Sequence, residues 1–250
     1  MDELLADLGA QHRELWSLLE PLDDAGWARP TPCEGWDIAD VVLHLQQTDQ
    51  LGIASIRGDL SRDIEEFMRA GGESSVDDAA AAGVEDARGA NGSAVGAQWR
   101  DSAAELREAL AAVDPSARLQ WVVGQLSART LAATRLSECW IHTGDVATAL
   151  GVELTPTNRV RHIARLAWRT VPYAFERAGR ALHGPVGFDL IGPDGDAWAF
   201  GLDGAPETVV RGDGVELCMV AARRLAPSDT ALVATGPDAA GVLELVRTYA

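Results

Sequence analysis

Two side chains that can bind a metal ion lie four residues apart in the segment from Arg135 to Gly151. Glu138 and His142 belong to the stretch RLSECWIHTGDVATALG, whose pattern is typical of a helix. At that spacing both side chains leave the same helical face. A carboxylate and an imidazole on one face can share a divalent ion. The spacing therefore predicts two ligands of a metal site.

His44 is the natural third ligand. It lies in the stretch DIADVVLHLQQTDQLG, where an otherwise apolar helical stripe carries an imidazole. With Glu138 and His142 it would form a His2Glu set, which holds zinc and leaves one coordination position open. Asp145 follows His142 by three residues and is placed to orient it. The alternatives are a chance surface Glu-His pair, a hydrogen-bonded core histidine and a solvated aspartate.

The elements around these residues predict an antiparallel four-helix bundle over residues 1–155. Helical patterns occur at residues 2–20, in the segment that carries His44, near 98–113 and near 127–150. Pro30 and Pro32 interrupt the pattern after the first helix, and Asp37 is placed to cap the second. The Ala, Gly and Asp stretch between Gly72 and residue 97 predicts a helical fragment inside a long connection.

The pattern changes after Gly151. A long helix is predicted over residues 157–182, followed by short segments, VGFDLIG, AWAFGL and ETVVRG, that alternate with turn signals as an antiparallel sheet would. Two helices, near residues 213–225 and 237–249, should pack on this sheet. Residues 156–250 therefore predict a small α+β domain, and the chain as a whole belongs to the α+β class.

Composition excludes several classes of protein. The net charge of -17 argues against nucleic-acid binding, which depends on clustered basic residues. No apolar run approaches the ~20 residues of a membrane span, and the acidic N-terminus does not resemble a signal peptide. The three cysteines, Cys33, Cys139 and Cys218, fit no disulfide framework. These features predict a cytoplasmic protein without a membrane or nucleic-acid partner.

Two stretches of the sequence resemble a known family. WARPTPCEGWDIADVVLHL, residues 27–45, followed about a hundred residues later by ECWIHTGDVATALG, is similar to the mycothiol-dependent maleylpyruvate isomerase family, whose first domain is a DinB-like four-helix bundle. In that family a His of the second helix and a Glu-x3-His of the fourth bind the metal, and they match His44, Glu138 and His142. The stretch VELCMVAARRLAPSDTALVATGPDAAGVLELV resembles the family's sterol-carrier-like C-terminal domain.

The resemblance implies mycothiol as a cosubstrate and a divalent ion, most simply zinc. A thiol that coordinates zinc is deprotonated, whereas a free thiol with a pKa near 8.5 is mostly protonated at neutral pH. The resulting metal-bound thiolate would add to a double bond or displace a leaving group in a small, acidic electrophile. The expected activity is that of a thiol S-transferase or isomerase. The family's cationic residue falls in AARRL, at Arg224 or its neighbour Arg223, where it would stabilise developing negative charge.

Two other functions remain open from the sequence. The open coordination position could activate water instead of a thiol, which would make the protein a hydrolase. Alternatively, the metal-stapled bundle and the second domain could hold a ligand without turnover. Function belongs to the site and not to the fold, so the family resemblance does not choose among them.

Overall fold

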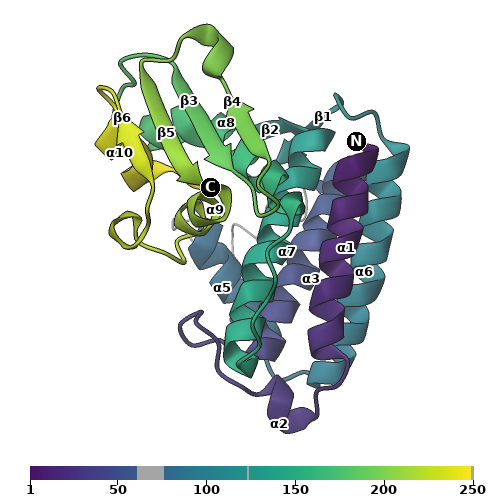
Figure 1. Cartoon of the computed structure of the whole chain (residues 1–250). Helices are drawn as coiled ribbons and strands as arrows, with labels where there is room; N and C mark the ends of the chain where they lie inside the picture. Colours follow the sequence, from purple (N-terminus) through teal and green to yellow (C-terminus); the bar gives the residue numbers. More distant parts are fainter. Residues whose placement is uncertain (61–75, 123, 249–250) are drawn as a thin grey trace. The chain divides into compact units, whose positions relative to one another are not determined.

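The computed structural model describes residues 1–60, 76–122 and 124–248. The chain divides into two compact units, Met1–Leu154 and Thr155–Ala250. Within the described ranges, no helix has both the length and the apolar character needed to cross a membrane. A helical first unit followed by a small sheet domain confirms the predicted α+β class (Figure 1).

Long helices packed side by side form the described part of the first unit (Figure 1). They are α1 (Asp2–Leu19), α3 (Ile38–Arg57), α6 (Gly92–Ala112) and α7 (Ala128–Leu150). The connections hold the shorter helices α2 (Asp24–Trp27) and α5 (Val76–Ala87) and an antiparallel hairpin of β1 (Arg118–Trp121) and β2 (Gly124–Ser127). Contacts of α3 with α6 and α7, and of α1 with the same two helices, close the bundle.

Local signals set the start of α3 and the two ends of α7. The Asp37 side chain accepts a hydrogen bond from the backbone N–H of Asp40, and the Asp40 side chain accepts one from the N–H of Asp37, which completes a capping box at the start of α3. Ser127 caps α7, and Gly151, with φ of 70°, ends it in the left-handed conformation. The two helices that carry the predicted ligands therefore have fixed starting points.

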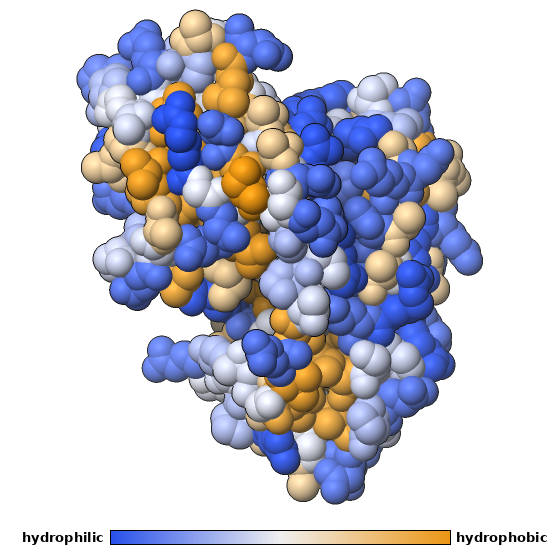
Figure 2. Space-filling model, in the orientation of Figure 1, coloured by the Kyte–Doolittle hydropathy of each residue, from blue (hydrophilic) through white to orange (hydrophobic). Residues whose placement is uncertain are grey.

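The bundle core is apolar around the ligand-bearing helices. Buried side chains from all four long helices meet in one cluster, among them Leu15, Val42, Trp99 and Val146. Space-filling colouring shows apolar side chains at the surface of the lower part of this unit as well (Figure 2). His44 and His142 belong to a small set of polar side chains that are buried in this unit, together with Asp49, Arg135 and Asp145.

The second unit is a four-stranded sheet with helices. Its elements are the 3-10 turn η1 (Asn158–Val160), α8 (Arg161–Arg177), β3 (Val186–Ile191), β4 (Ala197–Phe200), η2 (Leu202–Gly204), β5 (Thr208–Asp213), α9 (Gly214–Ala221), η3 (Pro227–Asp229), β6 (Val233–Thr235) and α10 (Ala239–Leu245). The strand order is β4-β3-β5-β6, and α8 contacts both α9 and α10. Phe188, Trp198 and Val210 fill the buried side of the sheet.

The sheet is mixed, so the prediction of a purely antiparallel sheet is wrong. The turn at Pro193-Asp194-Gly195 does form an antiparallel hairpin between β3 and β4. The chain then passes through η2 to the other side of β3, where β5 pairs with β3 in parallel. Turn residues mark where a strand ends but not on which side of the sheet the next strand is added. The hairpin β1–β2 and the short strand β6 were not predicted.

Several predicted helix boundaries also differ from the structure. The helix predicted over residues 157–182 begins after the turn η1 and ends at Arg177, two residues before Gly179 with its φ of 64°. The third bundle helix begins at Gly92 instead of near residue 98, because the Asn91 side chain caps it. The fragment predicted before residue 97 appears as α5, and the part of that stretch before residue 76 lies outside the described residues.

Candidate metal centre

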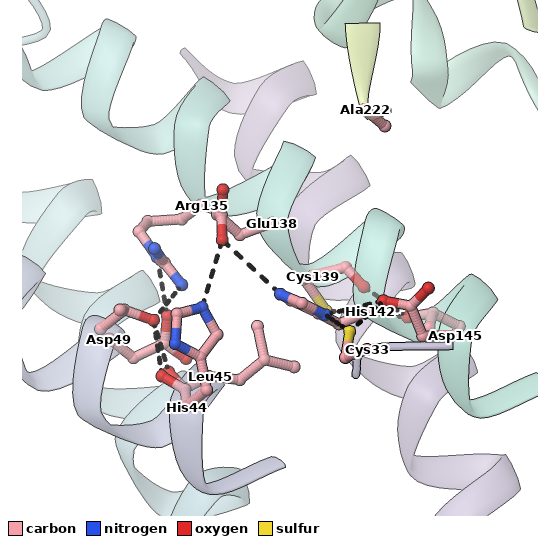
Figure 3. Close-up of polar contacts among 12 residues, drawn as sticks. Cys33, His44, Leu45, Asp49, Arg135, Glu138, Cys139, His142, Asp145 and Ala222 are labelled. Carbon is pink, nitrogen blue, oxygen red and sulfur yellow. Dashed lines mark hydrogen bonds and ion pairs between the residues drawn. The ribbon is translucent and has the colours of Figure 1, made fainter. Parts of the chain in front are cut away.

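The structure brings the three predicted ligands together. His44 projects from α3, while Glu138 and His142 project from α7 toward it (Figure 3). Glu138 Oε2 lies 3.4 Å from His44 Nε2 and 3.8 Å from His142 Nε2. A tetrahedral zinc ion with bonds of about 2.0–2.1 Å separates its ligand atoms by about 3.3 Å. These two distances are close to the size that such an ion needs, and the ligand atoms of the three residues all lie within 4.8 Å of one another.

The protonation states suit a ligand set. Burial raises the pKa of Glu138, but the hydrogen bond with His44 and the charges of His142 and Arg135 outweigh it and bring the pKa to about 2. Burial lowers the pKa of His44, so its imidazole is neutral. The site thus presents an ionised carboxylate and a neutral imidazole before any ion binds.

His142 is oriented by Asp145. The two groups lie 2.9 Å apart, between His142 Nδ1 and Asp145 Oδ2, and Asp145 is buried at 2% exposure. Because the carboxylate accepts a hydrogen bond from Nδ1–H, the Nε2 atom points to the side of Glu138 and is the atom that can bind an ion once it has released its proton. This is the arrangement of a ligating histidine held by a carboxylate partner. Cys33 also contacts Asp145, with its Sγ 3.2 Å from the same oxygen.

A buried ion pair next to the site links the two helices that carry the candidate ligands. Arg135, on α7, donates from Nε to Asp49 Oδ1 on α3 at 3.0 Å and from Nη2 to Thr48 Oγ1 at 2.7 Å. Thr48 in turn donates to the backbone carbonyl of His44 at 2.8 Å. Arg135 lies one turn before Glu138, and its charge contributes to the lowered pKa of that carboxyl group. The network connects the α3 backbone at His44 to the α7 turn that carries Glu138.

The arginines of AARRL lie past the end of α9 and not on it. The helix predicted to residue 225 ends at Ala221, because Arg223 adopts a left-handed conformation with φ of 59°. The N–H of Arg224 donates to the carbonyl of Met219, and the N–H of Arg223 to that of Val220, which forms a Schellman motif. The side chain of Arg223 donates to the carbonyl of Glu244 at 2.8 Å. Helical geometry therefore does not set the directions of the two guanidinium groups.

Three residues of the site, Cys33, Asp49 and Arg135, were not predicted from the sequence. Arg135 precedes Glu138 by three residues, so helical spacing alone places it on the ligand face. Asp49 follows His44 by five residues, and only the packing of α3 against α7 shows that it faces Arg135. Cys33 lies in the loop before α3, where no spacing rule applies.

Comparison with known proteins identifies the family of this chain. A family model described as the mycothiol maleylpyruvate isomerase N-terminal domain matches residues 8–147, a range that contains all three candidate ligands. The chain belongs to this family. Its sequence is similar to those of the uncharacterized proteins MT0041 and Rv0036c of two Mycobacterium tuberculosis strains. Each is 34% identical over 252 residues, covering 98% of this chain and 95% of the relative.

Solved structures of the mycothiol-dependent maleylpyruvate isomerase share the fold of this family member. One superimposes with a TM-score of 0.59 at 18% identity, and a histidine-to-alanine mutant of that isomerase with 0.60 at 20% identity. Each comparison covers 94% of this chain and 92% of the solved chain. At these identities the likeness establishes the fold.

Asp145→Asn should weaken metal binding by about 10–100-fold while leaving the bundle folded, because the amide is a poorer acceptor for His142 Nδ1–H than the carboxylate. The dissociation constant is measured by competition with a chromophoric chelator, and the fold by circular dichroism. Asp114→Asn is the matched control, since Asp114 lies in an exposed turn after α6. Equal metal affinities in both variants and the wild type would make Asp145 a structural residue only.

Metal binding should become tighter as the pH rises toward 9. Burial lowers the pKa of His142, but the hydrogen bonds with Asp145 and Cys33 and the nearby carboxylates raise it to about 9 in the metal-free protein. Below that pH the ion must displace the Nε2 proton, so the apparent affinity should change about tenfold per pH unit. Chelator competition between pH 6 and 9 measures the slope. An affinity independent of pH over this range would contradict it.

The metal-free protein should show the opposite trend. A raised folded-state pKa means that protonated His142 stabilises the fold fully below its unfolded-state pKa of about 6.5 and loses that contribution as the pH rises through 9. Urea unfolding of the metal-free protein should therefore give a lower free energy of unfolding at pH 9 than at pH 6.5.

Proposed function

We propose that the protein is a metal-dependent enzyme that uses mycothiol to transfer sulfur to, or isomerise, a small acidic electrophile. The observation that carries the proposal is the cluster of Glu138 with the buried His44 and His142, the latter oriented by Asp145, in a member of this family. The solved structures that share this fold are those of a mycothiol-dependent maleylpyruvate isomerase, which supports mycothiol as the thiol for this chain.

The donor set favours an anionic fourth ligand. Glu138 supplies one negative charge, and the two imidazoles supply none once His142 has released its Nε2 proton. A divalent ion, most simply zinc, held by these three groups would supply Lewis acidity and favour the thiolate form of a bound thiol. Both histidines are more than 90% buried, so little water would screen the charges of the site. Asp145 would hold His142 in the orientation needed for a ligand.

An arginine of the AARRL segment is the proposed partner for the substrate's negative charge. The Arg-Leu step at residues 224 and 225 matches the family's pattern better than the step at Arg223, which favours Arg224 for this role. Arg224→Ala should therefore lower turnover by about 10²–10³-fold with little change in metal content, whereas Arg223→Ala should have a smaller effect. Rates are compared at equal zinc occupancy. Near-wild-type rates in both variants would remove the second unit from the chemistry.

The test of the function uses zinc-loaded protein with mycothiol and an activated cis-alkene diacid or another small electrophile. Turnover that requires both the thiol and the metal supports the proposal. Turnover by the metal alone, without the thiol, would instead identify a hydrolase. Full metal occupancy with no turnover on a panel of electrophiles would identify a ligand-holding protein.

A further inference from the structure

The two ring nitrogens of His142 face different sets of side chains (Figure 3). Nε2 faces Glu138 and His44, as described above. Nδ1 faces Asp145 Oδ2 at 2.9 Å and Cys33 Sγ at 4.0 Å. The Cys33 sulfur is therefore next to the metal centre but on the side of the imidazole away from it. A thiol, a carboxylate and an imidazole nitrogen form a second group of three.

The second group also has the dimensions of a metal site. A tetrahedral ion with a bond of about 2.3 Å to sulfur and bonds of about 2.0–2.1 Å to nitrogen and oxygen places sulfur about 3.6 Å from each of them and separates nitrogen from oxygen by about 3.3 Å. The corresponding separations are 4.0 Å from Cys33 Sγ to His142 Nδ1, 3.2 Å from Sγ to Asp145 Oδ2, and 2.9 Å from Nδ1 to Oδ2. Each differs from the ideal by about half an ångström or less, which side-chain rotation can supply.

The loop that carries Cys33 is built to hold its position. The N–H of Cys33 donates to Thr31 Oγ1 at 3.2 Å, and the N–H of Trp36 donates to the carbonyl of Cys33 at 3.0 Å. Pro30 and Asp37 close the loop as a β-bridge directly before α3. The thiol is thus presented to His142 by an ordered backbone, so an ion would have little conformational entropy to remove on binding.

We propose that Cys33, Asp145 and His142 Nδ1 form a second metal position, selective for soft divalent ions. Thiolate ligands select soft ions, whereas the His2Glu set of the first centre lacks sulfur. Binding displaces the thiol proton of Cys33 and the Nδ1 proton of His142, and the thiolate and the Asp145 carboxylate then neutralise the two charges of the ion. The proposal does not depend on the mycothiol reaction.

The two positions compete for one imidazole. His142 serves an ion at Nε2 while its Nδ1 proton is held by Asp145, and an ion at Nδ1 requires that proton to leave. Occupation of both positions at once would require the ring to lose both protons. A soft ion at Cys33 therefore removes the carboxylate partner that orients His142 for the first centre.

Cadmium(II) titrated into the metal-free full-length protein tests the proposal, because cadmium bound to a thiolate gives an ultraviolet charge-transfer band. The wild type and His44→Ala should both develop the band with one cadmium per chain, since His44 belongs only to the first centre. Cys33→Ser should lose the band, and Asp145→Asn should weaken cadmium binding at least tenfold. A missing band in His44→Ala, or a full band in Cys33→Ser, overturns the proposal.

Two further measurements test whether another cysteine, or misfolding of a variant, accounts for the result. Cys218→Ala is the matched control, because Cys218 is fully buried in the second unit, and this variant should keep the band. In the His44→Ala protein, cadmium should slow alkylation of the half-buried Cys33 by iodoacetamide at least tenfold, measured on the Cys33 peptide. Unchanged alkylation in the presence of saturating cadmium would count against the site even if Cys33→Ser fails to fold.

Discussion

Replacing Arg135 with methionine should lower the free energy of unfolding by about 3–5 kcal/mol. Arg135 and Asp49 are each 3% or less exposed, and their side chains form a buried ion pair between α7 and α3. Burial raises the pKa of Asp49, and the guanidinium of Arg135 opposes this effect. Methionine keeps most of the volume of arginine but leaves the carboxylate without its partner in a medium of low polarity. Urea unfolding of the metal-free proteins measures the loss.

The surface pair of Arg57 and Glu105 provides the matched control. Its side chains are 57% and 48% exposed, so Arg57→Met should cost about 1 kcal/mol or less. The double variant Arg135→Met, Asp49→Leu should recover much of the lost stability, because no charge is then left unpaired. Equal losses from Arg135→Met and Arg57→Met would show that the buried pair contributes no more than an exposed one.

Removing any one of the three ligands should abolish metal retention in purified protein. His44→Ala, Glu138→Ala and His142→Ala each leave two protein ligands, and we expect metal content to fall below about a tenth of that of the wild type. Glu138→Ala should have the largest effect, because it removes the only negative charge of the set. Elemental analysis after gel filtration gives the content.

His183→Ala is a suitable control for this series. His183 lies in the second unit, where it pairs with Asp238 at 2.7 Å, and its replacement should leave the metal content unchanged. Full metal retention in the double variant His44→Ala, Cys33→Ser, which also lacks the second position, would show that the third ligand lies elsewhere, since His44 is the single ligand contributed by α3. Circular dichroism of each variant separates the loss of a ligand from the loss of the fold.

The parts of the site that follow helical spacing could be predicted from the sequence. Glu138, His142 and Asp145 lie on one helix, where the spacing alone fixes their relative directions. Asp37, as a capping residue, predicts where the helix that carries His44 begins. The same spacing places Arg135 on the ligand face, so its position could be predicted as well. Its role could not, because that role depends on a partner from another helix. Asp49 becomes that partner only through the packing of α3 against α7.

Features that depend on loops or on the order of strands could not be predicted. The position of Cys33 is set by backbone hydrogen bonds within the loop before α3, and the parallel pairing of β3 with β5 by the side on which the chain crosses the sheet. The end of α9 was misplaced because Arg223 occupies a left-handed position that usually falls to glycine. In each of these three cases, more than one arrangement of the chain has the same local sequence signals.

The candidate ligands come from only two of the four long helices, α3 and α7, and this gives the ion a topological role. His44 and Glu138 are 94 positions apart (138 minus 44), with α5 and α6 between them in the chain. An ion bound to both would join two parts of the folded chain that lie far apart in the sequence. Unlike a disulfide, this crosslink would be released on unfolding, so it would stabilise the folded state without restricting the unfolded chain. The resistance of the bundle to unfolding would then follow the concentration of available metal.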